Sequence, residues 1–378
     1  MGFFSFLLLP YFLFALSFSA QDMSLPEGPA LSQEQLLECP VGRGTLQCDA
    51  LLEEHIASLY DDYAYYYTKE EFDVLLEDYE GSFGGIGVSM INNVDGNIEV
   101  YSVLEDGPAK ETEISVGDIV LSADGHSLLG YDVSLGVRKV RGEIGTTVVL
   151  ELRHPDGEEY TVSIVREEII ADSVEGELFE EHPNTGYIYI YDFNEQTPRE
   201  FLEVYSELRE SRVLRTLILD LRSNGGGALD AAMYIANFFL PPGKVILKEK
   251  TIQGMAEYES MEGQLEEVEL VILVNEYTAS ASEVLAAALK EQAGAVLIGS
   301  TTFGKGITQA LATLPSGAGL RYTRSHYYTP NDYDLHEVGY PVDVEVPLSD
   351  DLTREEYWST DPDLNPCLKA VVDYFAAK

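Results

Sequence analysis

The chain has 378 residues, enough for two or three domains, and 45% of them are apolar, so disorder along its whole length is excluded. Its 66 acidic and 23 basic residues give a formal charge of −43. This balance excludes nucleic acid and anionic lipid as direct partners, because both bind clustered Lys and Arg. A solvated, self-repelling surface is the simplest interpretation; a saline habitat or a preference for basic substrates would produce the same balance.

The first twenty residues carry no charge, and Phe3 to Ala20 is nearly all apolar. This predicts an export signal over residues 1–20, although the usual basic start is absent. An uncleaved membrane anchor is the alternative, since about 18 apolar residues can just span a bilayer. Either interpretation predicts an extracytoplasmic location, where Cys39 and Cys48 could close a short loop and Cys367 is left over. No metal-binding spacing occurs, so no metal or other cofactor is predicted.

Residues 21–80 are predicted to form an acidic, mainly helical segment. Ser32 and Thr68 each begin the spacing of an N-terminal helix cap, with Gln or Glu three residues later. The tyrosines between residues 60 and 67 could form a packing surface or a binding strip, and packing is favoured. Residues 81–167 then change to short alternating strands with Asp-Gly turns, which predicts a small β-rich domain.

From about residue 184 the chain alternates between strands and helices. The predicted strands are Tyr187–Ile190, Leu217–Leu221, Val268–Val274 and Ala295–Ile298, and the predicted helices contain Pro198–Arg209, Ala232–Ala236 and Val284–Leu289. Such alternation predicts an α/β core with a mixed, partly parallel sheet. We assign residues 168–350 to this core and residues 351–378 to a C-terminal helical tail.

Ser280 and Lys305 are the most informative pair of residues. Ser280 separates a predicted strand from a predicted helix, where free backbone N–H groups gather. Lys305 lies between two glycines, and no Asp or Glu occurs in residues 301–307 to keep it charged. A lysine whose pKa is lowered by burial can activate a serine, so the pair predicts a hydrolase with a lysine base. Taken by itself, Lys305 could equally be a surface lysine in a turn.

Gly225–Gly227 follows a predicted strand and precedes a helix, but lacks the phosphate-binding glycine patterns. We interpret it as part of an oxyanion hole, with a second N–H from Ala281. A Ser-His-Asp triad is the competing chemistry. None of the six histidines lies in a recognisable motif, and His326, in the catalytic half, is the candidate that stays open.

Taken in order, these segments resemble the C-terminal processing (tail-specific) serine peptidases, over roughly residues 50–350. The matching segments are Gly81–Val88, Gly107–Lys110, Val116–Val120, Val140–Gly142 with Gly145–Thr146, Leu219–Gly227, Ser280–Glu283, Thr302–Gly306 and Tyr327–Pro330. Lys305 follows Ser280 by 25 residues, the interval of the family, and Gln309 matches its third catalytic residue.

The resemblance implies a serine endopeptidase in which Ser280 is the nucleophile, Lys305 the base and Gln309 orients the lysine, with an acyl-enzyme intermediate. Gly226 and Ala281 would bind the oxyanion.

The resemblance also implies an inserted PDZ domain that binds the free C-termini of protein substrates and can block or open the active site. Gly85, Ile86 and Gly87 would form its carboxylate loop. Arg141 would either sense bound peptide or form a structural salt bridge.

The chain departs from the family pattern at Thr112–Asp118, Asn331–Leu335 and Gly339–Asp343, which affects the substrate groove more than the catalytic residues. The first alternative function is a catalytically silent PDZ scaffold for protein tails. A second is a regulated peptidase that cleaves only a partner bound to the N-terminal segment. A homodimer through the terminal helices and membrane attachment by the N-terminus are further possible interactions.

Overall fold

The computed structural model describes residues 61–170, 172–182, 184–251, 254–261, 268–314, 316–347 and 353–378. The predicted export signal or anchor, Ser32, Cys39, Cys48 and Tyr60 lie outside these residues. None of the helices in the described ranges is long and apolar enough to cross a membrane.

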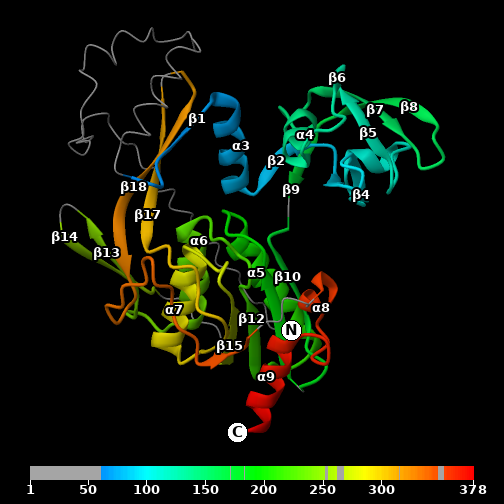
Figure 1. The fold of residues 1–378 in the computed structure, drawn as a ribbon. Helices are drawn as coiled ribbons and strands as arrows, with labels where there is room; N and C mark the ends of the chain where they lie inside the picture. The colour runs from blue at the N-terminus through cyan, green and yellow to red at the C-terminus, as the bar shows by residue number, and fades with distance from the viewer. Residues whose placement is uncertain are drawn as a thin grey trace, which may run out of the picture.

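The core is a six-stranded sheet in the order β10-β11-β12-β15-β16-β19, in which only β10 and β11 pair antiparallel (Figure 1). Its strands are β10 (Val174–Leu178), β11 (Thr185–Ile190), β12 (Thr216–Asp220), β15 (Glu269–Val274), β16 (Val296–Gly299) and β19 (Val344–Glu345). The central strands β12 and β15 are almost entirely buried, which explains their continuous apolar sequences. The predicted α/β core with a partly parallel sheet is confirmed.

Helices cover both faces of this sheet. One face packs against α5 (Thr197–Ser211), α6 (Leu229–Phe239) and α7 (Ala281–Ala293), and the other against α9 (Pro366–Ala376). Side chains alternate between the two faces along each strand: Leu219 packs with the first group of helices, Ile218 with α9. Helix α7 is buried over most of its length, because its many alanines let it approach the sheet closely.

A second sheet, which the sequence analysis did not predict, lies beside the core and is antiparallel throughout. Its strands are β1 (Tyr65–Tyr67), β13 (Val245–Thr251), β14 (Gly254–Glu259), β17 (Ile307–Thr313) and β18 (Gly319–Tyr328). Strand β1 comes from the segment expected to be helical and pairs Tyr66 with Leu320. This pairing places the N-terminal part of the described chain along β18, which also pairs with β17, the strand that follows Lys305.

The predicted β-rich domain forms a separate body with its own apolar core (Figure 1). Its elements are β3 (Val88–Asn92), β4 (Ile98–Val103), η1 (Pro108–Glu111), β5 (Ile119–Ala123), β6 (His126–Ser127), α4 (Val133–Val140), β7 (Thr147–Arg153) and β8 (Glu159–Val165). The chain enters through β2 (Ser82–Gly85) and leaves through β9 (Glu167–Ile170), which pair antiparallel. The domain is therefore inserted between the N-terminal segment and the core.

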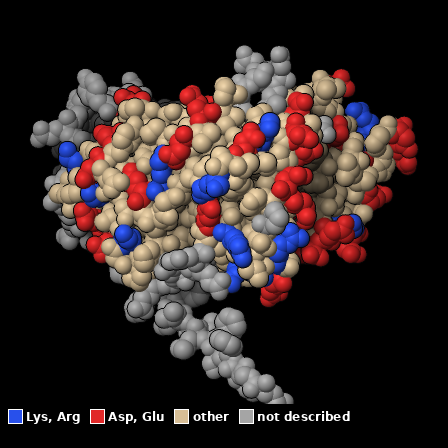
Figure 2. Space-filling model, turned by 90° about the horizontal axis from the view of Figure 1, so that it is seen from below, with Lys and Arg blue, Asp and Glu red and all other residues tan. Residues whose placement is uncertain are grey.

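Two further helices complete the fold: α3 (Lys69–Glu80), which precedes the inserted domain, and α8 (Arg354–Trp358), which precedes α9. The cap predicted at Thr68 is confirmed, since its side chain and that of Glu71 form a reciprocal capping box. Acidic side chains are spread across the face of the molecule seen in Figure 2, with fewer basic ones among them.

Candidate active site

Ser280 lies on the turn between β15 and α7, as the residue before the helix. Its backbone has φ 58° and ψ −119°, a conformation that costs a residue other than glycine about 1–3 kcal/mol. Several hydrogen bonds hold this turn against the turn that follows β12, and two of them converge on Asn224. The Ala279 N–H donates to Asn224 O at 3.0 Å, and Ser282 Oγ donates to Asn224 Oδ1 at 2.8 Å. Ser280 is therefore fixed between two strand ends.

The glycine turn after β12 lies directly against Ser280. Gly226 has a φ of +103°, and a Cβ there would lie 2.8 Å from Ser280 Cβ, so only glycine fits. The Gly226 N–H is donated to Asn224 Oδ1 at 2.8 Å. By contrast, the Ala281 N–H makes no hydrogen bond within the described residues. Of the two N–H groups predicted to bind an oxyanion, the Ala281 N–H is therefore available in this conformation, whereas the Gly226 N–H is already hydrogen-bonded to Asn224.

Glu283 connects Ser280 to Lys305. Its carboxylate is fully buried and accepts hydrogen bonds from Ser280 N (2.9 Å), Gly304 N (2.7 Å), Lys305 N (2.8 Å) and Thr302 Oγ1 (2.5 Å). Burial raises the pKa of the carboxyl, and these hydrogen bonds act in the opposite direction. Residues 301–307 contain no carboxylate, so the sequence pattern around Lys305 did not predict this neighbour. The Ser280-x-x-Glu283 spacing, that of a capping box, could have predicted the hydrogen bond from Ser280 N to Glu283, but not the one from Lys305 N.

Lys305 is half-buried on the loop between β16 and β17. Burial lowers the pKa of its ammonium, the nearby Arg321 lowers it further, and Glu283 opposes both effects. This is the direction that a lysine base requires. No hydrogen bond joins Ser280 Oγ to Lys305 Nζ in the described structure. The two residues are held together through the carboxylate of Glu283.

Tyr63 is a neighbour of the predicted base that the sequence analysis missed. Its carbonyl accepts a hydrogen bond from Gln309 Nε2 at 2.9 Å, and its ring centre lies 5.9 Å from Lys305 Nζ. Asp61 holds this segment in place, since its carboxylate accepts hydrogen bonds from the backbone N and the Oγ1 of Thr323, each at 2.8 Å. Tyr63 therefore contacts both residues predicted to act with Ser280.

His326 pairs with an acid, and within the described residues it makes no hydrogen bond to Ser280 or Lys305. Its Nε2 lies 2.8 Å from Asp334 Oδ1, on the exposed side of β18. His336 is closer to the lysine loop, because its Nδ1 accepts a hydrogen bond from Gly306 N at 3.3 Å. A Cβ on Gly306 would lie 2.8 Å from His336 Cβ, so a residue larger than glycine does not fit beside Lys305 at this position.

The predicted carboxylate loop of the inserted domain connects β2 to β3. Gly87 has a φ of +74°, and a Cβ there would lie 2.7 Å from Gly107 Cα. Ile86 is buried, and its carbonyl accepts a hydrogen bond from Ala109 N at 2.8 Å. Gly85 is the last residue of β2. The loop is thus packed closely against the start of η1.

Arg141 joins the inserted domain to α3. Its guanidinium lies 3.6 Å from the ring centre of Phe83 and forms an ion pair with Asp78 at 3.1 Å. The salt bridge considered for this residue is therefore present.

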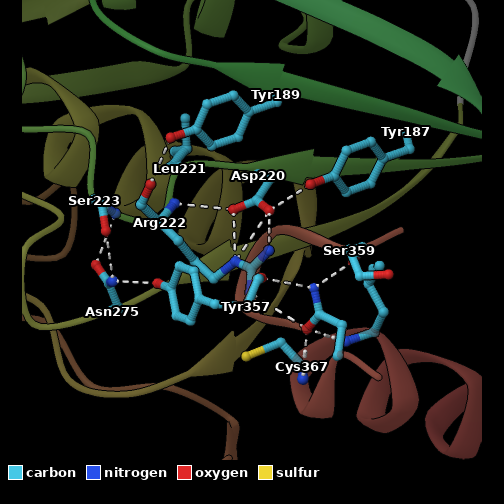
Figure 3. Close-up of polar contacts among 12 residues, drawn as sticks. Tyr187, Tyr189, Asp220, Leu221, Arg222, Ser223, Asn275, Tyr357, Ser359 and Cys367 are labelled. Carbon is cyan, nitrogen blue, oxygen red and sulfur yellow. Dashed lines mark hydrogen bonds and ion pairs between the residues drawn. The ribbon is translucent and has the colours of Figure 1, made fainter. Parts of the chain in front are cut away.

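An ion pair buried beneath the glycine turn holds the C-terminal segment (Figure 3). Arg222 and Asp220 are 1% and 0% exposed, and Arg222 Nη2 lies 2.6 Å from Asp220 Oδ2. Tyr187 donates its hydroxyl to the same carboxylate at 2.6 Å. Arg222 Nη1 donates to Tyr357 O at 3.2 Å and to Asn365 Oδ1 at 3.3 Å. The strand that leads to the glycine turn is thereby tied to α8 and α9.

Cys367 is a buried free thiol on α9.

No group of three or more His, Cys, Asp or Glu in the described residues is arranged to hold a metal ion. The fold and the site together define a class of protein: a hydrolase-like α/β core, with a serine and a half-buried lysine on adjacent loops, that carries an inserted β-rich domain.

Comparison with known proteins identifies both parts. Residues 184–346 match the model of peptidase family S41, and residues 84–165 match a PDZ domain. A carboxy-terminal processing protease, CtpA, from Bacillus subtilis is 33% identical over 80% of this chain and 64% of its own length. A carboxyl-terminal-processing protease from Picosynechococcus sp. is 34% identical over 78% of this chain and 72% of its own length. The chain spans 60% of the length of a probable CtpA-like serine protease from Staphylococcus haemolyticus.

Among solved structures, the photosystem II D1 C-terminal processing protease is 25% identical, with a TM-score of 0.52 over 90% of this chain and 89% of that chain. The chain therefore belongs to peptidase family S41, among the carboxy-terminal processing proteases.

Proposed function

We propose that this protein is a serine endopeptidase that cleaves exported proteins at or near their C-terminal tails. The observation that carries the proposal is the link between Ser280 and Lys305: one buried carboxylate, Glu283, accepts a backbone hydrogen bond from each of them. A strained serine at a helix start and a lysine with a lowered pKa are the two groups that this chemistry needs.

In the proposed mechanism, neutral Lys305 takes the proton of Ser280 Oγ as this oxygen attacks the scissile carbonyl carbon. The Ala281 N–H and, after it leaves Asn224, the Gly226 N–H bind the oxyanion. Lys305 then gives its proton to the leaving amine as the peptide bond breaks and the acyl-enzyme forms. Water, deprotonated by Lys305, releases the acyl group. Gln309 orients Lys305 throughout.

The PDZ domain would bind the free C-terminus of the substrate, with Gly85, Ile86 and Gly87 as the carboxylate loop. Arg141 would report that binding. It pairs with Asp78 on α3, and the segment just before α3 carries Tyr63 to Lys305 and Gln309. A substrate carboxylate that competes for Arg141 would act on the base through this segment. We further propose an extracytoplasmic location, based on the apolar residues 3–20.

The test is cleavage of an unfolded protein that ends in an apolar tail, compared with the same protein carrying a C-terminal amide. Mass spectrometry of the products locates the cleaved bonds. The proposal predicts cleavage near the tail, and slower cleavage of the amide, because the PDZ domain would bind it more weakly. Binding of the free tail without any cleavage would instead support the alternative, a catalytically silent PDZ scaffold.

A further inference from the structure

A pocket of about 740 Å³ opens at the edge of the core sheet, between β10 and the segment that contains α8. This volume is within the range of sites that bind small molecules. The peptidase mechanism uses none of its side chains. The lining residues that define its chemistry are Glu175, Glu177, Tyr189, Tyr191, Ser223 and Trp358.

Three of these side chains form an aromatic cage. The ring of Tyr189 is edge-on to Tyr191, with centroids 4.4 Å apart and planes at 84°, and edge-on to Trp358, at 5.1 Å and 73°. All three rings line the pocket. The negative π-face of Tyr or Trp attracts a cation, and enclosure by several such rings is the arrangement that binds organic ammonium groups in proteins.

Two carboxylates add negative charge to this cage. Glu175 and Glu177 are two residues apart on β10, so both side chains lie on the same side of the strand. The Tyr191 hydroxyl donates a hydrogen bond to the Glu175 carboxylate, which fixes this charge at the cage. No Lys, Arg or His is among the lining residues. The Arg222 cation 5.6 Å from the Trp358 ring is paired with buried Asp220.

We propose that this pocket binds an organic cation, and that the occupant is a Lys or Arg side chain of a polypeptide. Strand β10 is the edge of the core sheet, and its exposed residues 175–177 border the pocket, so an extended chain can lie beside it. The pocket is also adjacent to the glycine turn, because Ser223 lines it and Tyr189 donates its hydroxyl to Arg222 O at 3.1 Å. The choice of a polypeptide rests on the proposed function, whereas the binding of a cation does not.

Trp358 makes the test direct, because it is the only tryptophan in the chain. Its fluorescence is followed in the full-length protein during titration with the N-acetyl methylamides of arginine, lysine and the neutral norleucine. We expect saturable changes with arginine and lysine that weaken as salt is added, and none with norleucine. The double variant Glu175→Gln/Glu177→Gln should weaken binding at least about thirtyfold, because two charge interactions are lost and each contributes about fivefold even when screened by bulk water.

Three controls make the result specific. Glu180→Gln/Glu181→Gln removes two exposed carboxylates just beyond β10 that do not line the pocket, and should leave binding unchanged. Ser280→Ala should also bind normally, which separates this inference from the proposed peptidase activity. Circular dichroism establishes that each variant is folded.

Equal responses to norleucine and lysine, or an undiminished response in Glu175→Gln/Glu177→Gln, would overturn the assignment of a cation site. No saturable response to either basic amide would overturn it as well. Choline is titrated in parallel: binding tighter than that of both amides would assign the pocket to a free quaternary ammonium and overturn the choice of a polypeptide side chain.

Discussion

Replacing Arg222 with methionine tests the role of the ion pair beneath the glycine turn. The variant Arg222→Met keeps an unbranched, apolar side chain of shorter reach but leaves the Asp220 carboxylate fully buried without its cation. Breaking a buried pair in this way costs about 3–5 kcal/mol, because a buried charge is left uncompensated. Loss of the hydrogen bonds to Tyr357 O and Asn365 Oδ1 should also release the C-terminal segment from the strand.

The assay is urea unfolding followed by the fluorescence of Trp358, which lies in this network. With a slope of about 3 kcal/mol per molar urea, the loss corresponds to a midpoint lower by about 1–1.7 M. The double variant Asp220→Asn/Arg222→Met removes both charges and should recover part of the loss. A loss of unfolding free energy below about 1 kcal/mol in Arg222→Met, with no recovery in the double variant, would show that this ion pair does not stabilise the fold.

Three further substitutions test the active site. Tyr63→Ala exposes Lys305 to water, which raises the pKa of the lysine. Because the neutral amine is the base, the pH–activity profile should move to higher pH. The control Tyr63→Phe keeps the ring and should leave the profile in place. An unmoved profile in folded Tyr63→Ala would refute this role. Gly226→Ala puts a Cβ 2.8 Å from Ser280 Cβ. It should reduce kcat at least about a hundredfold, which is the effect of losing an oxyanion donor. A near-normal kcat would exclude the glycine turn from the site. Glu283→Gln turns amide hydrogens toward the N–H donors, which should lower both the free energy of unfolding, by about 1–3 kcal/mol, and the activity. Urea unfolding measures the first effect, and an unchanged free energy of unfolding would contradict the bridging role of this carboxylate.

The elements that the sequence predicts well are those with a strong local pattern. Strands β12 and β15 are continuous apolar runs between turns, and α7 is rich in alanine. The second sheet escaped prediction because its strands are assembled over long distances in sequence. Strand β1 has only three residues, and it pairs with β18 more than 250 residues later.

The site shows the same division. The proposed roles of Ser280 and Lys305 could be inferred from the sequence, because each residue lies in a local motif with a glycine or a helix start beside it. Tyr63 could not, because its carbonyl meets Gln309 across 246 residues of sequence and a backbone carbonyl leaves no mark on side-chain identity. The hydrogen bond from Gly226 to Asn224 is likewise a property of conformation, which residue types alone do not determine.

The proposal that Ser280 is the nucleophile and Lys305 its base is tested most directly by the rate of substrate cleavage. This rate is measured for Ser280→Ala and Lys305→Ala beside the control variants Ser206→Ala and Lys369→Ala. The two control residues are exposed and lie on α5 and α9, outside the site. The account predicts that each site variant is folded and loses at least about a thousandfold in kcat, while both controls keep the activity of the unmodified protein. Activity that survives Lys305→Ala would contradict the lysine base and make His326 or another group the candidate.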